Sequence, residues 1–403
     1  MFLAKLTRTQ LVRNNVQIVV NQTRSLKEIK CKAAICWEPN KPLKIEEVTV
    51  APPDENQVRI KMVATGICHT DAVTWRGEDA DAVFPVVLGH EGSGIVESVG
   101  KNVKQFKAGD HVIPVFVPYC AKCKFCQSRK TNICDKIHDV PGGIAPGKGL
   151  LLNGKTPFSC KGKPVYNFMG TSTFSEYTVT DDIFVCKINK KAPLDKVCLL
   201  GCGVSTGYGA AINDAKVRPG STCAVWGLGG VGLSVVMGCK RAGASIVCGI
   251  DINSKKCKIG QIFGITHFIN PNETDECIKD YLLKLSNGGF DYTFESCGIT
   301  KSMEDAMDVT HPGWGICTVM GVAPTGEKIS TSPVNLIAGR KWIGSAYGGF
   351  NVTEIPALVN DYMSGNIKLD ELITHTVTLE NVNQAFENMF GGKGLRTVVK
   401  FKT

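Results

Sequence analysis

A glycine-rich turn between two apolar segments constrains the fold of this chain more than any other feature. Residues 222–227 form an apolar run rich in strand-forming residues, and it continues directly into Gly227-Leu-Gly-Gly-Val-Gly232. The first glycine of such a turn permits a tight bend, the second lets the backbone approach a pyrophosphate, and the third lets the next helix pack closely on the strand. A helical segment and a second apolar run ending at Asp251 complete the pattern. The sequence therefore predicts a strand–helix–strand unit that binds a dinucleotide at the start of its helix.

The acid at the end of the second run predicts which dinucleotide is bound. Asp251 lies 19 residues after Gly232, where a carboxylate accepts hydrogen bonds from the adenosine ribose. The same carboxylate would repel a 2′-phosphate, so we expect NAD rather than NADP; the alternative is that Asp251 only caps a helix. The cofactor contacts expected from the turn are Gly227, Gly229, Gly230, Val231 and Gly232.

Four cysteines in a loop-like stretch predict a closed metal site. Their spacing is C-x2-C-x2-C-x7-C, and they are Cys120, Cys123, Cys126 and Cys134. Four thiolates on one compact loop suit tetrahedral zinc, and an all-cysteine shell is structural. The bacterial iron–sulfur pattern begins in the same way but closes after three residues with a proline, whereas here the gap is seven and Asp135 follows. A zinc module for nucleic acid is the other alternative, but this loop lies within an enzyme-like chain. We therefore expect a structural zinc lobe at residues 118–136.

Three further ligand-type residues predict a second, open metal site. Cys68 precedes a histidine, a threonine and an aspartate, His90 lies between a glycine and a glutamate, and Cys202 lies between two glycines. Two cysteines and one histidine leave a fourth zinc position for water or substrate, which is the ligation of a catalytic zinc site. A lone histidine in an apolar run is more often a core residue, but the nearby glycines and the two cysteines favour His90 as a ligand.

The composition excludes several classes of protein. Of the 403 residues, 43% are hydrophobic and 21% are charged, which is ordinary for a globular protein and excludes a largely disordered chain. The net charge of +9 includes five basic residues within positions 1–27, so the rest of the chain carries only +4 and no nucleic-acid partner is expected. Many of the eighteen cysteines lie in apolar runs, and no secretory signal peptide is visible, so we expect a reducing compartment.

Residues 1–28 are interpreted as a basic N-terminal extension. They contain no acid before Glu28 and include many Ser, Thr, Asn and Gln residues, a composition typical of a mitochondrial transit peptide. The alternative is a disordered extension of a cytoplasmic protein. Residues 219–239 are uncharged and long enough to span a bilayer, but they contain six glycines, five of them within 227–238, so a turn is expected there and no membrane partner.

The periodicity of the chain changes along its length. Short alternating strands are expected from about residue 29 to 115, and loops over 118–165. From about residue 206 the pattern becomes strand, helix, strand, with expected segments at 223–227, 230–241, 245–251, 292–295 and 316–322.

In this order, the motifs resemble those of the zinc-dependent medium-chain alcohol dehydrogenases. The resemblance runs from about Ile29 to the C-terminus, and it rests on the four-cysteine lobe, the glycine-rich turn and the sequences at 89–94, 201–209 and 395–399. Within the family, the sequences similar to the class III branch, the glutathione-dependent formaldehyde dehydrogenases, are those at 68–72, 169–179 and 192–203.

The resemblance implies an α/β architecture with two domains and a partner subunit. A GroES-like β-barrel catalytic domain would comprise residues 29–203 and 347–403. A Rossmann domain with a doubly wound parallel sheet would comprise 204–346, with the active site in the cleft between the two. The resemblance also implies NAD and two zinc ions per subunit, one catalytic and one structural, and a homodimer.

The resemblance further implies a role for each residue of the open metal site. Zinc held by Cys68, His90 and Cys202 would bind the substrate oxygen, Thr70 would accept the alcohol proton, and Asp71 would orient His90. Glu91 would enter the zinc shell transiently. Further cofactor contacts would be His69, Lys256, Val322 and Arg396, and the substrate pocket would include Asp79, Asp81, Phe116, His138, Phe168 and Met169.

Three departures from the class III pattern bear on the substrate. The arginine that binds the substrate carboxylate in that branch is His138 here, a neighbouring glutamine is Asp135, and a lysine aligns with Pro312; an insertion also falls at 139–146. Charge-assisted arginine–carboxylate contacts are strong, so their loss should weaken binding of a glutathione adduct, although Lys130 or Lys136 are candidate replacements.

We therefore expect an NAD-dependent zinc alcohol dehydrogenase that reversibly oxidises small-molecule primary or long-chain alcohols to aldehydes. The alternative within the family is an S-(hydroxymethyl)glutathione dehydrogenase. The alternative from another class is a non-catalytic protein that binds NAD and zinc.

Overall fold

The computed structural model describes residues 27–128, 130–137, 149–274 and 276–402. The expected leader, apart from its last two residues, lies outside the described residues, as do His138 and the insertion at 139–146. The strands at the N-terminal end include a closed barrel in the order β1-β2-β7-β8-β4. Its strands are β1 (Ile29–Cys36), β2 (Lys44–Val50), β4 (Val86–Val87), β7 (Phe158–Cys160) and β8 (Lys163–Asn167). The last two were expected to be loop; that expectation is wrong, because β7 pairs with both β2 and β8.

A seven-stranded sheet lies beside the barrel and includes the C-terminal strands of the described chain. The strand order is β10-β6-β5-β3-β18-β17, with β9 also paired to β3. The strands are β3 (Gln57–Gly66), β5 (Glu91–Val99), β6 (His111–Pro114), β9 (Tyr177–Asp181), β10 (Val185–Lys187), β17 (Ile373–Thr378) and β18 (Arg396–Lys400). Because β18 pairs antiparallel with β3, residues more than three hundred positions apart are neighbours in this sheet.

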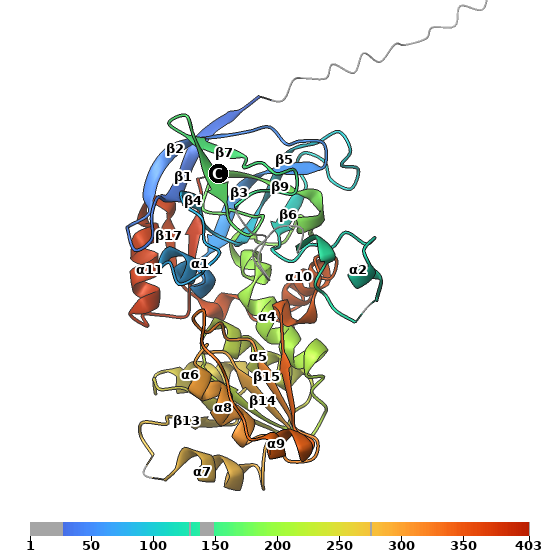
Figure 1. The fold of residues 1–403 in the computed structure, drawn as a ribbon, viewed down its shortest axis with the longest axis vertical. Helices are drawn as coiled ribbons and strands as arrows, with labels where there is room; N and C mark the ends of the chain where they lie inside the picture. The colour runs from blue at the N-terminus through green and yellow to red at the C-terminus, as the bar shows by residue number, and fades with distance from the viewer. Residues whose placement is uncertain (1–26, 129, 138–148, 275, 403) are drawn as a thin grey trace, which may run out of the picture.

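A six-stranded parallel sheet forms the other half of the molecule (Figure 1). Its order is β13-β12-β11-β14-β15-β16, which confirms the doubly wound sheet expected from the sequence. The strands are β11 (Thr222–Trp226), β12 (Ile246–Ile250), β13 (His267–Ile269), β14 (Tyr292–Glu295), β15 (Ile316–Val319) and β16 (Lys341–Gly344), and the helices between them are α5 (Gly230–Arg241), α6 (Lys256–Phe263), α7 (Ile278–Leu285), α8 (Thr300–Asp308) and α9 (Pro333–Ile337). The order reverses between β11 and β14, and in such sheets ligands bind at the carboxyl ends of the strands on either side of that point.

Glycines set the spacing of the first helix of this sheet. A Cβ at Gly232 would lie 1.7 Å from the carbonyl oxygen of Gly227, so only glycine lets α5 start this close to the turn. A Cβ at Gly207 would likewise lie 2.1 Å from the carbonyl oxygen of Val231. Gly207 belongs to α4 (Gly203–Gly209), which lies between the two halves of the molecule in Figure 1.

The remaining helices cover the barrel half. They are α1 (His69–Trp75), α2 (Lys124–Ser128), α3 (Leu194–Val197), α10 (Ile355–Met363) and α11 (Val382–Phe390). The Trp75 ring stacks on Phe386 at 5.8 Å and on Phe390 at 5.7 Å between ring centroids, which fixes α1 against α11. One apolar core is shared by both sheets and by the barrel, from Ile35 to Val225 and Phe294. Within the described part of the chain, no helix has the length and apolar character needed to cross a membrane. The exact domain boundaries stay a prediction.

Candidate active site

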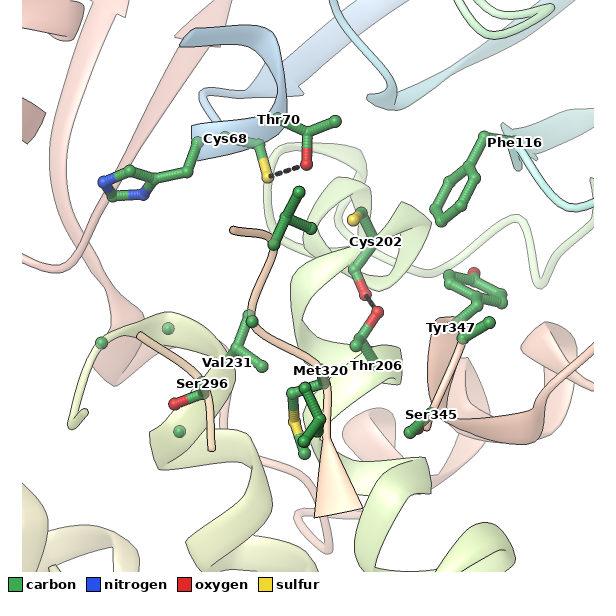
Figure 2. A pocket seen from close by; sticks show the side chains of 18 of the residues that line it. Cys68, Thr70, Phe116, Cys202, Thr206, Val231, Ser296, Met320, Ser345 and Tyr347 are labelled. Atoms are coloured by element: carbon green, nitrogen blue, oxygen red, sulfur yellow. Dashed lines mark hydrogen bonds between the residues drawn. The ribbon is translucent and has the colours of Figure 1, made fainter. Parts of the chain in front are cut away.

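A large cavity lies between the barrel half and the carboxyl ends of the parallel strands. Its volume is about 1780 Å³, above the range of about 300–1,000 Å³ typical for one small ligand, so it has room for a dinucleotide and a substrate together. Figure 2 shows Cys68 and Thr70 projecting into it from the α1 end, across from Val231 and Ser296.

Four metal-ligand side chains meet at the inner end of this cavity. The ligand atoms of Cys68, His90, Glu91 and Cys202 all lie within 4.8 Å of one another, and all four residues are buried. His90 Nε2 is buried and has no hydrogen-bond partner among the described residues. An orphaned imidazole nitrogen between two thiols is the donor set that suits zinc, so these residues fit a catalytic zinc ion.

Asp71 connects the two segments that carry Cys68 and His90. One carboxylate oxygen, Oδ2, accepts the backbone N–H of Cys68 at 3.1 Å, which caps the first turn of α1. The other oxygen, Oδ1, lies 3.0 Å from His90 Nδ1 and 3.0 Å from the backbone nitrogen of Gly89. With Nδ1–H donating to this carboxylate, the lone pair of Nε2 faces the two thiols.

The electrostatics of the cluster favour a thiolate at Cys68. Its hydrogen bond with Cys202, together with the nearby His90 and Arg396, holds the pKa of the Cys68 thiol well below its usual value. Glu91 is fully buried and forms an ion pair with Arg396, and its Oε1 accepts the backbone N–H of Gly203 at 3.1 Å. Burial raises the pKa of Glu91 to about 7 in spite of that arginine.

Aromatic and apolar side chains form the wall next to the metal cluster. The Phe116 ring packs edge-on to His90 at 5.8 Å, and the Phe168 ring does so at 5.9 Å. Phe116 and Met169 line the cavity together with Thr70. Phe168 contacts the His90 ring but is not among the lining residues. The structure thus brings Phe116 and Met169, but not Phe168, to the predicted substrate pocket.

Acidic residues lie at the outer end of the same cavity. Asp79 lines it, and its two oxygens accept hydrogen bonds from Thr74 Oγ1 at 3.2 Å and from the backbone N–H of Asp81 at 3.0 Å. Asp81 itself is not among the lining residues. His138, the remaining pocket prediction, lies outside the described residues, so the structure says nothing about its position.

The predicted cofactor residues line the same cavity, from the glycine-rich turn to the metal cluster, where Arg396 pairs with Glu91. The five residues predicted from the turn all line it, as do His69, Lys256, Val322 and Arg396. Asp251 lies just behind, where its Oδ2 accepts the Leu228 N–H at 2.8 Å and its Oδ1 accepts the Asn253 N–H at 2.9 Å. The carboxylate therefore braces the glycine-rich turn from the end of β12, and each oxygen keeps a second lone pair for a ligand.

The four-cysteine lobe is a second compact metal-ligand cluster. The sulfur atoms of Cys120 and Cys126 lie 3.9 Å apart, and those of Cys123 and Cys134 also lie 3.9 Å apart. Tetrahedral zinc with bonds of about 2.3 Å places its sulfurs at about this spacing, so the four thiols fit a structural zinc ion. Burial would raise the pKa of Cys123, but N–H groups of Cys126 and Asp135 outweigh it and lower that pKa to about 6.

Several lining residues were missed by sequence reasoning. They follow the carboxyl ends of β14, β15 and β16, and they are Ser296, Cys297, Met320, Gly321, Ser345 and Tyr347. The rule that ligands bind at the carboxyl ends of parallel strands was a usable signal for them. Asn132 was also missed: its Nδ2 donates to the carbonyl oxygens of Ala346 and Phe350, both at 2.8 Å, and so ties the cysteine lobe to the cavity wall.

Comparisons with known proteins agree with this geometry. A family model described as alcohol dehydrogenase GroES-like domain matches residues 54–190, and one described as zinc-binding dehydrogenase matches residues 230–363. The chain is 54% identical to an alcohol dehydrogenase class-3 of Drosophila melanogaster, over 93% of this chain and 98% of the relative. It is 51% identical to the protein of the same name in Myxine glutinosa, over 92% and 98% respectively. The crystal structure of benzyl alcohol dehydrogenase from Acinetobacter calcoaceticus superposes with a TM-score of 0.84 at 29% identity, covering 93% of this chain and all of that one.

Proposed function

We propose a substrate for this chain, which belongs to the zinc-containing alcohol dehydrogenases and has class-3 enzymes among its relatives. The proposed reaction is the reversible oxidation of primary alcohols with an apolar chain, with NAD as the cofactor. That it is an oxidoreductase with zinc and a nicotinamide cofactor follows from the family. The observation that supports the apolar substrate is the wall beside Thr70, where Val73, Phe116 and Met169 line the cavity.

In this proposal the side chains around the cluster bind the alcohol and move its proton. When bound, zinc draws electron density from the alcohol oxygen as a Lewis acid, and the nicotinamide accepts a hydride. Thr70 Oγ1, which lies 3.8 Å from Cys68 Sγ, accepts the hydroxyl proton. Val73 lines the cavity one turn further along α1 and cannot carry a proton, so the onward path uses the His69 imidazole, which also lines the cavity, the cofactor ribose or water.

The choice of NAD over NADP rests on Asp251. Asp251 follows the last residue of β12, and its carboxylate lies next to the glycine-rich turn. A 2′-phosphate on the adenosine ribose would therefore meet a negative charge. We also propose two zinc ions per subunit, one for each cluster.

The second candidate substrate is S-(hydroxymethyl)glutathione. Two observations favour it: the class-3 name of the relatives, and the charged side chains in the cavity lining, which include Asp79 and Lys130. A lining with both an acid and a base would suit a substrate that carries both charges.

The first experiment compares the two substrates on the full-length enzyme. We expect kcat/KM for NAD reduction to be higher with octanol than with formaldehyde plus glutathione, because the pocket is apolar next to Thr70. A glutathione adduct preferred by more than about 100-fold would overturn the apolar-chain proposal and establish the alternative. The variant Asp79→Asn should then lower kcat/KM for the adduct and leave that for octanol unchanged.

We further propose a homodimer joined at the β16 edge of the parallel sheet. This strand is the last in the sheet order, and an unpaired edge is a template for pairing with another chain. Exposed apolar side chains lie near it, with Ile337 at 83% and Trp314 at 58% exposure. Sedimentation of the purified protein should give twice the chain mass of 43.4 kDa, and a mass of 43.4 kDa would contradict the proposal.

A further inference from the structure

A buried glutamate ends β14 beside the glycine-rich turn. Glu295 has no exposed surface, and in the sheet it pairs with Trp226, the residue immediately before the turn. It belongs to neither metal cluster and is not itself among the cavity-lining residues.

Two loops converge on this residue. Its Oε1 accepts the backbone N–H groups of Cys297 at 2.8 Å and of Gly298 at 3.0 Å, with Ile299 N at 3.5 Å. Its main-chain oxygen accepts the N–H groups of Met320 and Gly321, both at 3.1 Å. The lining residues supplied by these loops are Ser296, Cys297, Met320, Gly321 and Val322. One residue therefore contacts both loops, and the first of them adjoins the glycine-rich turn, where Ser296 Oγ donates to the Gly227 carbonyl oxygen at 3.1 Å.

The two loops interlock closely around the carboxyl group. A Cβ at Gly321 would lie 2.2 Å from Gly298 N and 2.4 Å from Glu295 Oε2, so this position has no space for a side chain. Glu295 Oε2 is buried and has no hydrogen-bond partner among the residues that the structure describes. A buried carboxyl oxygen without a hydrogen-bond partner lowers the stability of the folded protein. A function at the adjacent ligand cavity would explain why an acid lies here.

We propose that Glu295 is a cofactor-positioning residue: its carboxyl group holds the 297–299 loop by hydrogen bonds and packs against Gly321, and its main-chain oxygen holds Met320 and Gly321, which together set the spacing that admits the nicotinamide cofactor. Successive backbone N–H groups in a turn form a concavity that attracts anions. Here the side-chain carboxyl group of Glu295 occupies that concavity. The N–H groups of the 297–299 loop therefore do not compete with the start of α5 for the cofactor phosphates.

The test is the affinity for NADH, measured by fluorescence titration of the full-length protein, with zinc content measured in parallel. Glu295→Ala removes the acceptor of three N–H groups, and we expect the Kd for NADH to rise about tenfold or more. The zinc content should stay unchanged, and the KM for alcohol at saturating NAD should change by less than about threefold. Glu295→Gln keeps an acceptor oxygen, so its Kd should lie between those of the wild type and Glu295→Ala.

Asp291 at the opposite end of the same strand supplies a matched control. Its Oδ2 accepts the Thr222 N–H at 2.8 Å and its Oδ1 accepts Trp314 Nε1–H at 2.6 Å, and it is not among the cavity-lining residues. Asp291→Ala should lower the Tm but leave the Kd for NADH unchanged.

An unchanged Kd in Glu295→Ala, or an equal rise in Asp291→Ala, would overturn the proposal and reduce Glu295 to a packing residue. Should Glu295→Ala fail to fold, Gly321→Ala tests the same point, because its Cβ would force the two loops apart. A rise in the Kd for NADH supports the proposal, and a folded Gly321→Ala variant with wild-type affinity contradicts it.

Discussion

At the scale of single residues, Asp71 arranges most of the open metal cluster by itself. Its two oxygens accept the N–H groups of Cys68 and Gly89 and the Nδ1–H of His90. Family resemblance predicted the contact with His90. The two backbone contacts were beyond sequence reasoning, because they depend on how α1 packs against β5. Glu295 was missed for a similar reason, since its partners are backbone groups that leave no sequence pattern.

Replacing Asp71 with asparagine should weaken the catalytic zinc site. The amide keeps the size of the side chain but loses the charge that strengthens its hydrogen bonds. Loss of such a partner costs about 10–100-fold in metal affinity, so we expect Asp71→Asn to lose one zinc ion to a chelator far sooner than the wild type does. Zinc retained per chain against chelator concentration measures this. Asp110→Asn is the control, because Asp110 is also buried but bonds to Lys187, outside the cavity; equal retention in Asp71→Asn and the wild type would refute the prediction.

Asp110 also predicts a pH dependence of stability. Burial would raise the pKa of Asp110, but hydrogen bonds from the Lys187 ammonium and the Lys107 N–H outweigh it and hold this pKa below its usual value. A depressed folded-state pKa contributes stability that is complete above the unfolded-state value of about 3.9 and is lost as the pH falls through the folded-state value. The wild type should therefore exceed Asp110→Asn in free energy of unfolding at pH 7, and the difference should shrink as the pH falls below about 4. Urea denaturation at several pH values measures it, and a difference that stays constant down to pH 3 would contradict it.

At the scale of elements, the sequence pattern predicted a helix or strand correctly where a local motif determines where that element begins. The helix expected at residues 230–241 is α5 as observed, because the glycine-rich turn determines where it begins. The expected segment at 316–322 ends early, at Val319, since its last residues turn into the loop that lines the cavity. The strands β7 and β8 were missed because Lys, Gly and Pro fill that stretch, and only their pairing with β2 and β4 makes them strands.

Two glycines of the turn should respond differently to substitution by alanine. Gly232→Ala places a Cβ 1.7 Å from the Gly227 carbonyl oxygen, so both the Tm and the affinity for NADH should fall. Gly229→Ala meets nothing within 4 Å, so its Tm should stay near that of the wild type while NADH binds more weakly, because the new methyl group stands where the pyrophosphate approaches. Thermal unfolding and NADH titration of both variants test this. A Gly229→Ala variant with a Tm as low as that of Gly232→Ala would contradict the prediction that a methyl group fits at position 229 without a clash.

At the scale of the whole molecule, the sequence pattern could not place the last strands. That β18 pairs with β3 is a contact between distant parts of the chain, which periodicity does not encode; the expectation that the C-terminal segment joins the first one came from family resemblance alone. The position of the cysteine lobe could not be predicted from the sequence pattern either, because the contact of Asn132 with the segment at 346–350 depends on tertiary packing.

Removing one cysteine of the lobe should destabilise the whole molecule. We expect Cys120→Ser to bind one zinc ion fewer per chain than the wild type and to lose Tm, because a structural zinc contributes directly to folding. Cys202→Ser should also lose one zinc ion but keep a higher Tm, since hydrogen bonds of Asp71 and Glu91 already hold the segments of its cluster together. Elemental analysis and calorimetry of both variants measure this, and a Cys120→Ser protein with wild-type zinc content would contradict it.

The pairing of β18 with β3 has a consequence for the order of events during synthesis. While the ribosome is still translating, β3 and β5 have left the exit tunnel, but the strand that completes their sheet does not yet exist. Arg396, the first residue of β18, is also the ion-pair partner of the buried Glu91. The carboxylate beside the metal cluster therefore stays without its counter-charge until a residue 305 positions further along the chain has been made, so the active site matures only after the whole parallel sheet has been synthesised.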